Sequence, residues 1–230
     1  MYYFLFTKYS EKRAGYMPYN VNPRRIIKEC KCKAYYTEYA EPIAFDIKGA
    51  LCDYYMVDNQ LMISEKYLNV IRNAGFTGFN IRNAVVRTWN KAENNDDIKE
   101  LKYYEMVLTG RCGLLRNMDG DELPHCEMCG RRIPHTGLLI EGVSFRETLY
   151  DGSDFFAFDN LWNIPIISDE VKKILTKNKL TNLKFVPLSE MVFNDTLPRS
   201  LIEDWLNEGK VSNELKAVWI RYGIIHEDNK

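Results

Sequence analysis

The feature that most constrains the fold of this chain is a segment of aromatic and acidic residues that occurs twice. Residues 53–59 (DYYMVDN) return as residues 154–160 (DFFAFDN). The match continues from residues 63–65 (ISE) to residues 167–169 (ISD), after three extra residues around 161–163 in the second segment. Packing does not demand matched Asp, Asn and Ser at loop positions. We therefore interpret the two segments as an internal duplication.

Each repeated segment predicts a helix directly after the serine that the two segments share. Ser64 and Ser168 are placed as N-caps, because a serine oxygen there accepts a hydrogen bond from a free N–H of the first turn. Apolar residues then recur at helical spacing and define one face. These residues are Tyr67, Val70, Ile71 and Ala74 in the first segment and Val171, Ile174 and Leu175 in the second.

The ends of these helices and the strands around them are also indicated by local patterns. Gly75 and Asn178 are the predicted left-handed helix ends, since Gly and Asn tolerate positive φ best. Alternating apolar residues predict strands at 79–81 and 183–185. The short apolar stretch 1–7 predicts a first strand instead of a signal peptide, because it lacks a basic region before it and a small-residue cleavage site. Each segment is thus an extended stretch, a helix and a strand.

Outside the repeats, the patterns predict further strands and two C-terminal helices. Residues 103–109 alternate enough for a strand, and residues 138–140 predict another. Ser200 and Glu203 have the spacing of a capping box that opens one helix, and Ser212 is placed to cap the next. We predict an α+β protein with two related strand–helix–strand halves, 1–100 and 101–230, which form two domains or one compact domain.

A metal-binding motif lies between the repeats, at residues 126–130 (CEMCG). Two thiols separated by two residues and followed by Gly predict a tight turn that directs both sulfurs to one point. Such a turn supplies half of a tetrahedral site. Cys30 and Cys32 are the best candidates for the other half, and the four thiolates Cys30, Cys32, Cys126 and Cys129 would hold a structural zinc ion with no open coordination position.

Alternatives to this ligand set remain open. His125 precedes the motif and could replace Cys30 or Cys32, and the four cysteines could be packed side chains without a metal. The flanking cations Lys31, Lys33, Arg131 and Arg132 would offset the negative charge of a four-thiolate zinc site. The solitary thiols Cys52 and Cys112 are interpreted as small core residues.

Charge and composition restrict the classes of function. The chain has a formal net charge of -1 and 13% aromatic residues, which suits a folded protein with a large core and disfavours a general nucleic-acid binder. The first alternative is a zinc-ribbon protein that binds nucleic acid through the charges of Arg131 and Arg132 and stacking on Tyr35 and Tyr36. The chain has clustered thiols and no apolar run long enough for a membrane span. We therefore expect it in the reducing cytoplasm.

A zinc-dependent hydrolase or deaminase is the second alternative. The segment from His125 to Cys129 is similar to one half of the nucleobase-deaminase signature, which also needs an upstream H-x-E or C-x-E. Here the H-x-E is His125-Cys126-Glu127, which overlaps the cysteine pair, so one segment would have to fill both roles. We therefore predict no enzymatic activity.

The order of motifs resembles the double-CxxCG immunity proteins of bacterial polymorphic-toxin systems and the related immunity families built on the second half alone. The resemblance covers most of residues 1–190, and the first pair departs from it, since it is C-K-C and not CxxCG. It implies a non-enzymatic protein that binds and neutralises a cognate protein toxin in the producing cell. The residues that carry it are Cys126, Cys129, Gly130, Asp154, Phe155, Phe156, Ile167, Ser168, Asp169, Phe185, Val186 and Pro187.

Overall fold

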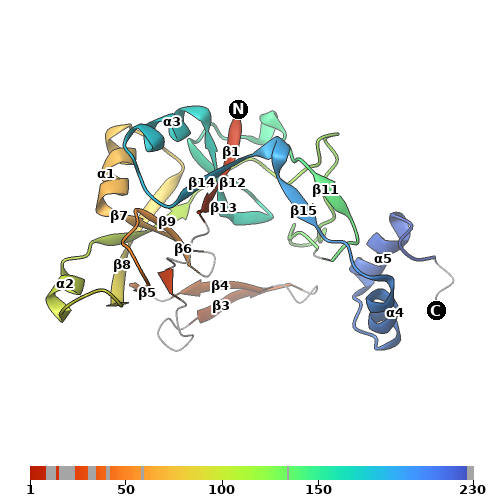
Figure 1. Ribbon diagram of the computed structural model, residues 1–230. Coiled ribbons are helices and arrows are strands. Elements are labelled where there is room, and N and C mark those ends of the chain that lie inside the picture. Colours follow the sequence, from red (N-terminus) through yellow and green to blue (C-terminus); the bar gives the residue numbers. More distant parts are fainter. Residues whose placement is uncertain are drawn as a thin grey trace.

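The computed structural model describes residues 1–8, 14–15, 24–30, 35–39, 42–57, 60–133 and 135–226. Over these residues the chain is an α+β protein with two mixed β-sheets, two small ribbons and five α-helices, which confirms the predicted class. In Figure 1, two helices lie next to each other above the sheets and two others lie close to the C-terminus. No helix within the described ranges is long and apolar enough to span a membrane.

The two sheets are mixed because each contains one parallel strand pair. The pair is β10 (Gly110–Arg111) with β12 (Phe155–Phe158) in one sheet and β5 (Ile43–Ile47) with β8 (Phe79–Trp89) in the other. The five-stranded sheet has the order β10-β12-β13-β1-β14, and the six-stranded sheet has the order β2-β5-β8-β9-β7-β6. The strands of the first are β1 (Tyr2–Thr7), β10 (Gly110–Arg111), β12 (Phe155–Phe158), β13 (Leu161–Ser168) and β14 (Leu183–Pro187). Those of the second are β2 (Ala14–Gly15), β5 (Ile43–Ile47), β6 (Tyr54–Val57), β7 (Gln60–Ser64), β8 (Phe79–Trp89) and β9 (Tyr103–Leu108).

The remaining elements are two antiparallel ribbons and the helices. One ribbon joins β3 (Arg24–Glu29) to β4 (Tyr35–Tyr39), and the other joins β11 (Leu139–Glu141) to β15 (Val192–Asn194). The helices are α1 (Glu65–Asn73), α2 (Asn95–Lys99), α3 (Asp169–Lys177), α4 (Arg199–Asn207) and α5 (Asn213–Arg221), with short 3₁₀ turns η1 (Glu147–Leu149) and η2 (Leu188–Glu190).

The two repeated segments have the same local structure. Each is a β-hairpin, β6–β7 or β12–β13, followed by a nine-residue helix and a strand. The Ser64 side chain accepts from the Tyr67 N–H, and the Ser168 side chain accepts from the Val171 N–H, as predicted. The three extra residues of the second segment lengthen its hairpin, because β13 has eight residues and β7 has five.

The helix ends differ from the prediction at one position. Gly75 has φ +72° as expected, but Asn178 has φ −82° and the left-handed residue is Lys179, at φ +52°. Asn178 instead closes the helix in a right-handed region and donates from Nδ2 to the Ile174 carbonyl oxygen at 2.9 Å. The prediction for Asn178 was wrong because α3 extends one residue further than the preference for Asn at positive φ suggests.

Strands β1 and β9 occupy equivalent places in the two sheets. Strand β9 lies between β7 and β8, and β1 lies between β13 and β14. Their registers match: Tyr103 is opposite Ser64, and Tyr2 is opposite Ser168. The backbone contacts at their ends also match, since Glu65 N donates to Lys102 O and Asp169 N donates to Met1 O, both at 3.1 Å. The sheet of each repeated segment is therefore completed by a strand from the other half of the chain.

Reciprocal hydrogen bonds join the two repeated segments. The Asp53 Oδ2 atom accepts from the backbone N and the Oγ1 of Thr181, both at 2.8 Å. The Asp154 Oδ2 atom accepts from the same two atoms of Thr77, at 2.8 and 3.0 Å. Each acid therefore satisfies backbone and side-chain donors of the opposite segment. This exchange indicates an approximate twofold relation between the segments and supports a structural interpretation of both acids.

The largest core cluster lies where the repeated segments meet. Helices α1 and α3 contact each other there and cover inward-facing residues of both sheets. Aromatic rings provide much of the contact: Tyr54 stacks on Tyr67 with centroids 6.0 Å apart, and Phe155 meets the ring of Phe79 edge to face at 5.5 Å. Because both segments bury side chains in this cluster, neither can lose its partner without exposing apolar surface.

The C-terminal helices form a separate small cluster around Trp219. Helix α5 is capped by Ser212, as predicted, but α4 begins after Pro198 and has no side-chain cap. Ser200 lies inside this helix, because the fixed φ of Pro198 already suits the start of a helix two residues earlier than predicted. The Trp219 indole N–H donates to the His135 carbonyl oxygen at 3.0 Å, so the helices contact the chain just after residues 126–130.

Candidate metal centre

Residues 126–130 form the predicted tight turn. The Gly130 N–H donates to the Cys126 carbonyl oxygen at 2.7 Å, and the Cys126 N–H donates to the Arg131 carbonyl oxygen at 2.9 Å. Gly130 has φ +73°, a conformation that favours glycine. The turn therefore holds Cys126 and Cys129 on one side, as a zinc knuckle does.

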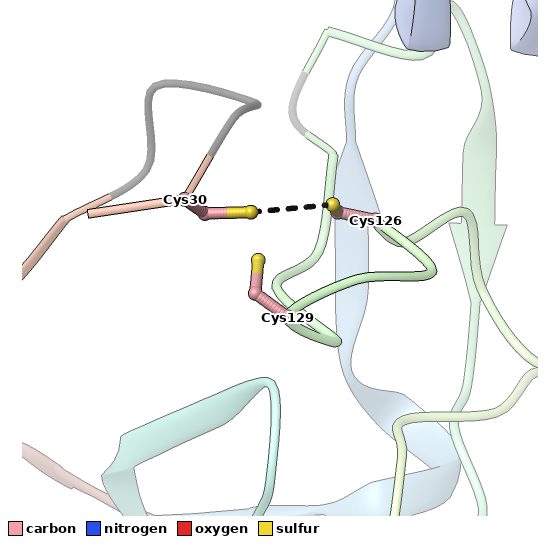
Figure 2. A group of neighbouring side chains, drawn as sticks. All are labelled: Cys30, Cys126 and Cys129. Carbon is pink, nitrogen blue, oxygen red and sulfur yellow. Dashed lines mark hydrogen bonds between the residues drawn. The ribbon is translucent and has the colours of Figure 1, made fainter. Parts of the chain in front are cut away.

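A third cysteine from the N-terminal part of the chain reaches this knuckle. Cys30 directly follows strand β3 and lies at the end of the β3–β4 ribbon. Its Sγ is 3.9 Å from the Sγ of Cys126, and the sulfurs of Cys30, Cys126 and Cys129 all lie within 4.8 Å of one another. Figure 2 shows the side chain of Cys30 meeting those of Cys126 and Cys129 on the knuckle. Residues that are distant in sequence thus form one cluster.

The geometry and chemistry of this cluster fit a zinc ion. A tetrahedral site with zinc–sulfur bonds of about 2.3 Å places its sulfurs about 3.8 Å apart, close to the 3.9 Å between Cys30 and Cys126. Cys30 is 8% exposed and Cys126 is 5% exposed. An all-sulfur donor set selects zinc over magnesium or calcium. Three of the four predicted ligands are therefore brought together, and the fourth, Cys32, lies outside the described residues.

His125 is not a member of this group. Its Nδ1 lies 2.8 Å from the Leu123 carbonyl oxygen, and its Nε2 lies 3.7 Å from a carboxylate oxygen of Glu122. A ring nitrogen bound to a carbonyl oxygen must carry a proton, so Nδ1 cannot bind a metal in this arrangement. The hypothesis that His125 replaces a cysteine has no support in this geometry.

One of the basic residues after the knuckle, Arg132, makes contacts that the sequence analysis did not predict. Arg132 forms an ion pair with Asp195 at 2.5 Å, and its guanidinium lies 5.1 Å from the ring centre of Phe193. Asp195 also accepts from the Thr136 hydroxyl at 3.2 Å. Arg132 thus anchors the knuckle to β15 and the residue after it. Lys31 and Lys33, the other cations expected beside the sulfurs, lie outside the described residues.

The two solitary cysteines lie outside the cluster. Cys112 is fully buried, and burial raises the pKa of its thiol, which keeps it protonated and unreactive. Cys52 is half-buried and packs at the edge of the cluster around Phe45. These positions agree with their interpretation as small packing residues.

Sequence reasoning missed two supports of the site. The Arg132–Asp195 pair and the Trp219 contact with His135 join segments more than fifty residues apart. No local pattern marks them, because an isolated charge or Trp has many possible partners. The Asp–Thr pairs had a detectable signal in the repeat. Asp53 matches Asp154, and Thr77 of the first copy matches Thr181 of the second.

Comparison with known proteins adds no family. No protein-family model matches the chain, and a search of the curated proteins finds no significant match. The resemblance to the immunity proteins therefore rests on the motifs and their order.

Proposed function

We propose that this protein is an immunity protein that binds and neutralises a cognate bacterial toxin in the cytoplasm, and that a structural zinc ion joins its two related halves. Cys30 comes from the first half, and Cys126 and Cys129 precede the second repeated segment. Cys32 is the proposed fourth ligand. A zinc ion bound by all four would connect the β3–β4 ribbon to the knuckle and would have no position for a substrate or water.

The observation that carries this proposal is the convergence of Cys30 on the knuckle between two units with the same architecture. This arrangement has the order of elements that the resemblance implies. The acids that the repeat shares, Asp53 and Asp154, are engaged with Thr181 and Thr77 and are thereby occupied in structural hydrogen bonds. Glu127, the acid nearest the sulfurs in sequence, is exposed and is not among the clustered ligands. A binding role fits these features better than a deaminase mechanism, which needs a glutamate beside the zinc.

Co-expression with a toxin tests the function. The probe is the C-terminal domain of the large toxin expected to be encoded beside this protein. Induction of that domain should stop bacterial growth, and co-expression of the full chain should restore it. The two proteins should also elute together at equimolar ratio in size-exclusion chromatography.

A matched variant and a salt titration complete this test. Cys52→Ser, outside the cluster, should rescue growth as the unchanged chain does. Absence of both rescue and complex would refute the immunity function. Retention of the purified protein on nucleic acid, lost steeply as salt rises, would favour the zinc-ribbon alternative.

A further inference from the structure

The three clustered thiols differ in exposure. Cys30 and Cys126 are 8% and 5% exposed, whereas Cys129 is half-buried and follows the exposed Met128. A solvent-borne oxidant therefore meets Cys129 first. Thiolates react with hydroperoxides far faster than thiols do, and a metal-bound cysteine is held as the thiolate.

The thiols also differ in how their positions are maintained. Cys126 and Cys129 lie on one turn, closed by the 2.7 Å hydrogen bond between Gly130 N and Cys126 O. Cys30 lies at the end of the β3–β4 ribbon, which belongs to neither of the large sheets. If the metal leaves, the knuckle keeps its two thiols adjacent, whereas the position of Cys30 depends on the contact of the ribbon with the knuckle.

We propose that this site is a peroxide-sensitive connection: oxidation joins Cys126 to Cys129 in a disulfide, releases the zinc ion and detaches the β3–β4 ribbon from the knuckle. This inference rests on the zinc centre of the proposed function. Its oxidant class is hydrogen peroxide or another hydroperoxide. The ligand loss removes two of the four proposed zinc–sulfur bonds, which is enough to lower zinc affinity greatly.

The chemistry balances in two steps. Hydrogen peroxide transfers one oxygen atom to the Cys129 sulfur, so that a sulfenic acid forms and the other peroxide oxygen leaves as water. The Cys126 sulfur then attacks the sulfenic sulfur; a sulfur–sulfur bond forms, the sulfur–oxygen bond breaks and a second water leaves. The two thiolates lose two electrons in total, the peroxide gains them, and solvent supplies the two protons that complete the two waters. The disulfide is reversible by a thiol reductant.

Zinc release and disulfide mapping on the full-length, zinc-loaded protein test this inference. Elemental analysis first establishes the metal content, expected to be about one zinc per chain. Hydrogen peroxide is then titrated while a chromogenic chelator reports free zinc and a thiol reagent counts the remaining thiols in denaturant. About two thiols should be lost for each zinc released. Dithiothreitol with added zinc should restore both values.

Peptide mapping and proteolysis identify the bond and its consequence. Mass spectrometry should find Cys126 and Cys129 in one disulfide-linked peptide, distinct from a Met128 sulfoxide, which adds oxygen without removing thiols. Trypsin should cleave at the basic residues between 24 and 33 several-fold faster after oxidation. Cys52→Ser, a matched half-buried thiol outside the cluster, should leave the titration unchanged.

The outcomes separate this inference from the zinc centre itself. Purified protein without metal would refute both. Zinc that stays bound after excess peroxide, a disulfide that contains Cys30, or unchanged proteolysis of the ribbon would overturn the peroxide-sensitive connection while the zinc centre stands.

Discussion

The two repeated segments differ at the left-handed residue before their last strand. Gly78 occupies this position in the first segment at φ +90°, and Asn182 occupies it in the second at φ +64°. A Cβ on Gly78 would lie 1.9 Å from the Phe155 carbonyl oxygen. Asn182 instead has room for a side chain, and its Nδ2 donates to the Tyr54 carbonyl oxygen at 2.7 Å. Gly78 thus packs closely against the backbone of the opposite segment, whereas Asn182 forms a hydrogen bond with it.

The reciprocal acids differ as well. Asp53 is 8% exposed and also accepts from the Ser64 hydroxyl at 2.8 Å, whereas Asp154 is only half-buried. Hydrogen bonds to a buried carboxylate contribute more to stability than the same bonds near water, because the carboxylate has no solvent to replace a lost donor. The comparison teaches that matched residues in a repeat acquire unequal energetic importance from their surroundings.

Loss of the zinc ligands should have the largest effect, because it removes the bound metal and, with it, the connection between the β3–β4 ribbon and the knuckle. We expect the double variant Cys126→Ser with Cys129→Ser, or chelation of the unchanged protein, to lower the free energy of unfolding by on the order of 5 kcal/mol. Urea unfolding followed by circular dichroism measures this value. Cys52→Ser is the matched control and should unfold close to the unchanged protein. Equal stability with and without chelator would contradict the expected structural role of zinc.

Substitution of the left-handed residues should have the second-largest effect, and the effect should differ between the two segments. Gly78→Ala forces a Cβ against a backbone oxygen at positive φ and should destabilise the protein by about 4 kcal/mol or more. Asn182→Ala removes one hydrogen bond and should cost about 1–2 kcal/mol. Thermal unfolding of both variants measures the difference. A similar loss in both would mean that the close approach of Gly78 to Phe155 has little energetic weight.

Truncation of the acids should have a smaller and unequal effect. We expect Asp53→Ala to cost about 3 kcal/mol and Asp154→Ala about 1 kcal/mol, since only Asp53 is buried and accepts a further hydrogen bond from Ser64. A double-mutant cycle of Asp53→Ala with Thr181→Val should give a coupling energy of about 1 kcal/mol or more. Additive effects in this cycle would show that the Asp53–Thr181 hydrogen bonds do not stabilise the pair.

The smallest expected effect is a gain in stability when Tyr67 is substituted. Tyr67 in α1 and Val171 in α3 occupy matched positions of the repeat, and both side chains are fully buried. The Tyr67 hydroxyl has no hydrogen-bond partner among the described residues, and burial raises its pKa. Tyr67→Phe removes this unsatisfied group and should stabilise the protein by up to about 1 kcal/mol in urea unfolding. Marked destabilisation would reveal a partner for the hydroxyl.

Local patterns were sufficient for much of the fold. Serine caps and apolar spacing located α1, α3 and α5. A short apolar stretch located β1, and alternation located β9 and the strands after the two repeated helices. They could not locate interactions between distant segments, such as the Arg132–Asp195 pair. The short helix α2 was also not predicted, although the reciprocal cap between Asn94 and Asp97 at its start is a local signal. The knuckle was recognisable from Cys126, Cys129 and Gly130, because its geometry is contained within five residues.

The sequence by itself determined the repeated units, their helices and the turn that presents two thiols. The tertiary structure alone decided which sheet each central strand joins. Tyr2 and Tyr103 begin strands with similar aromatic patterns, and backbone hydrogen bonds between strands carry no record of side-chain identity. Either strand could therefore pair with either hairpin. Packing of both halves around one shared core selects the exchange. The contact of the β3–β4 ribbon with the knuckle, also decided by the tertiary structure, places Cys30 beside Cys126.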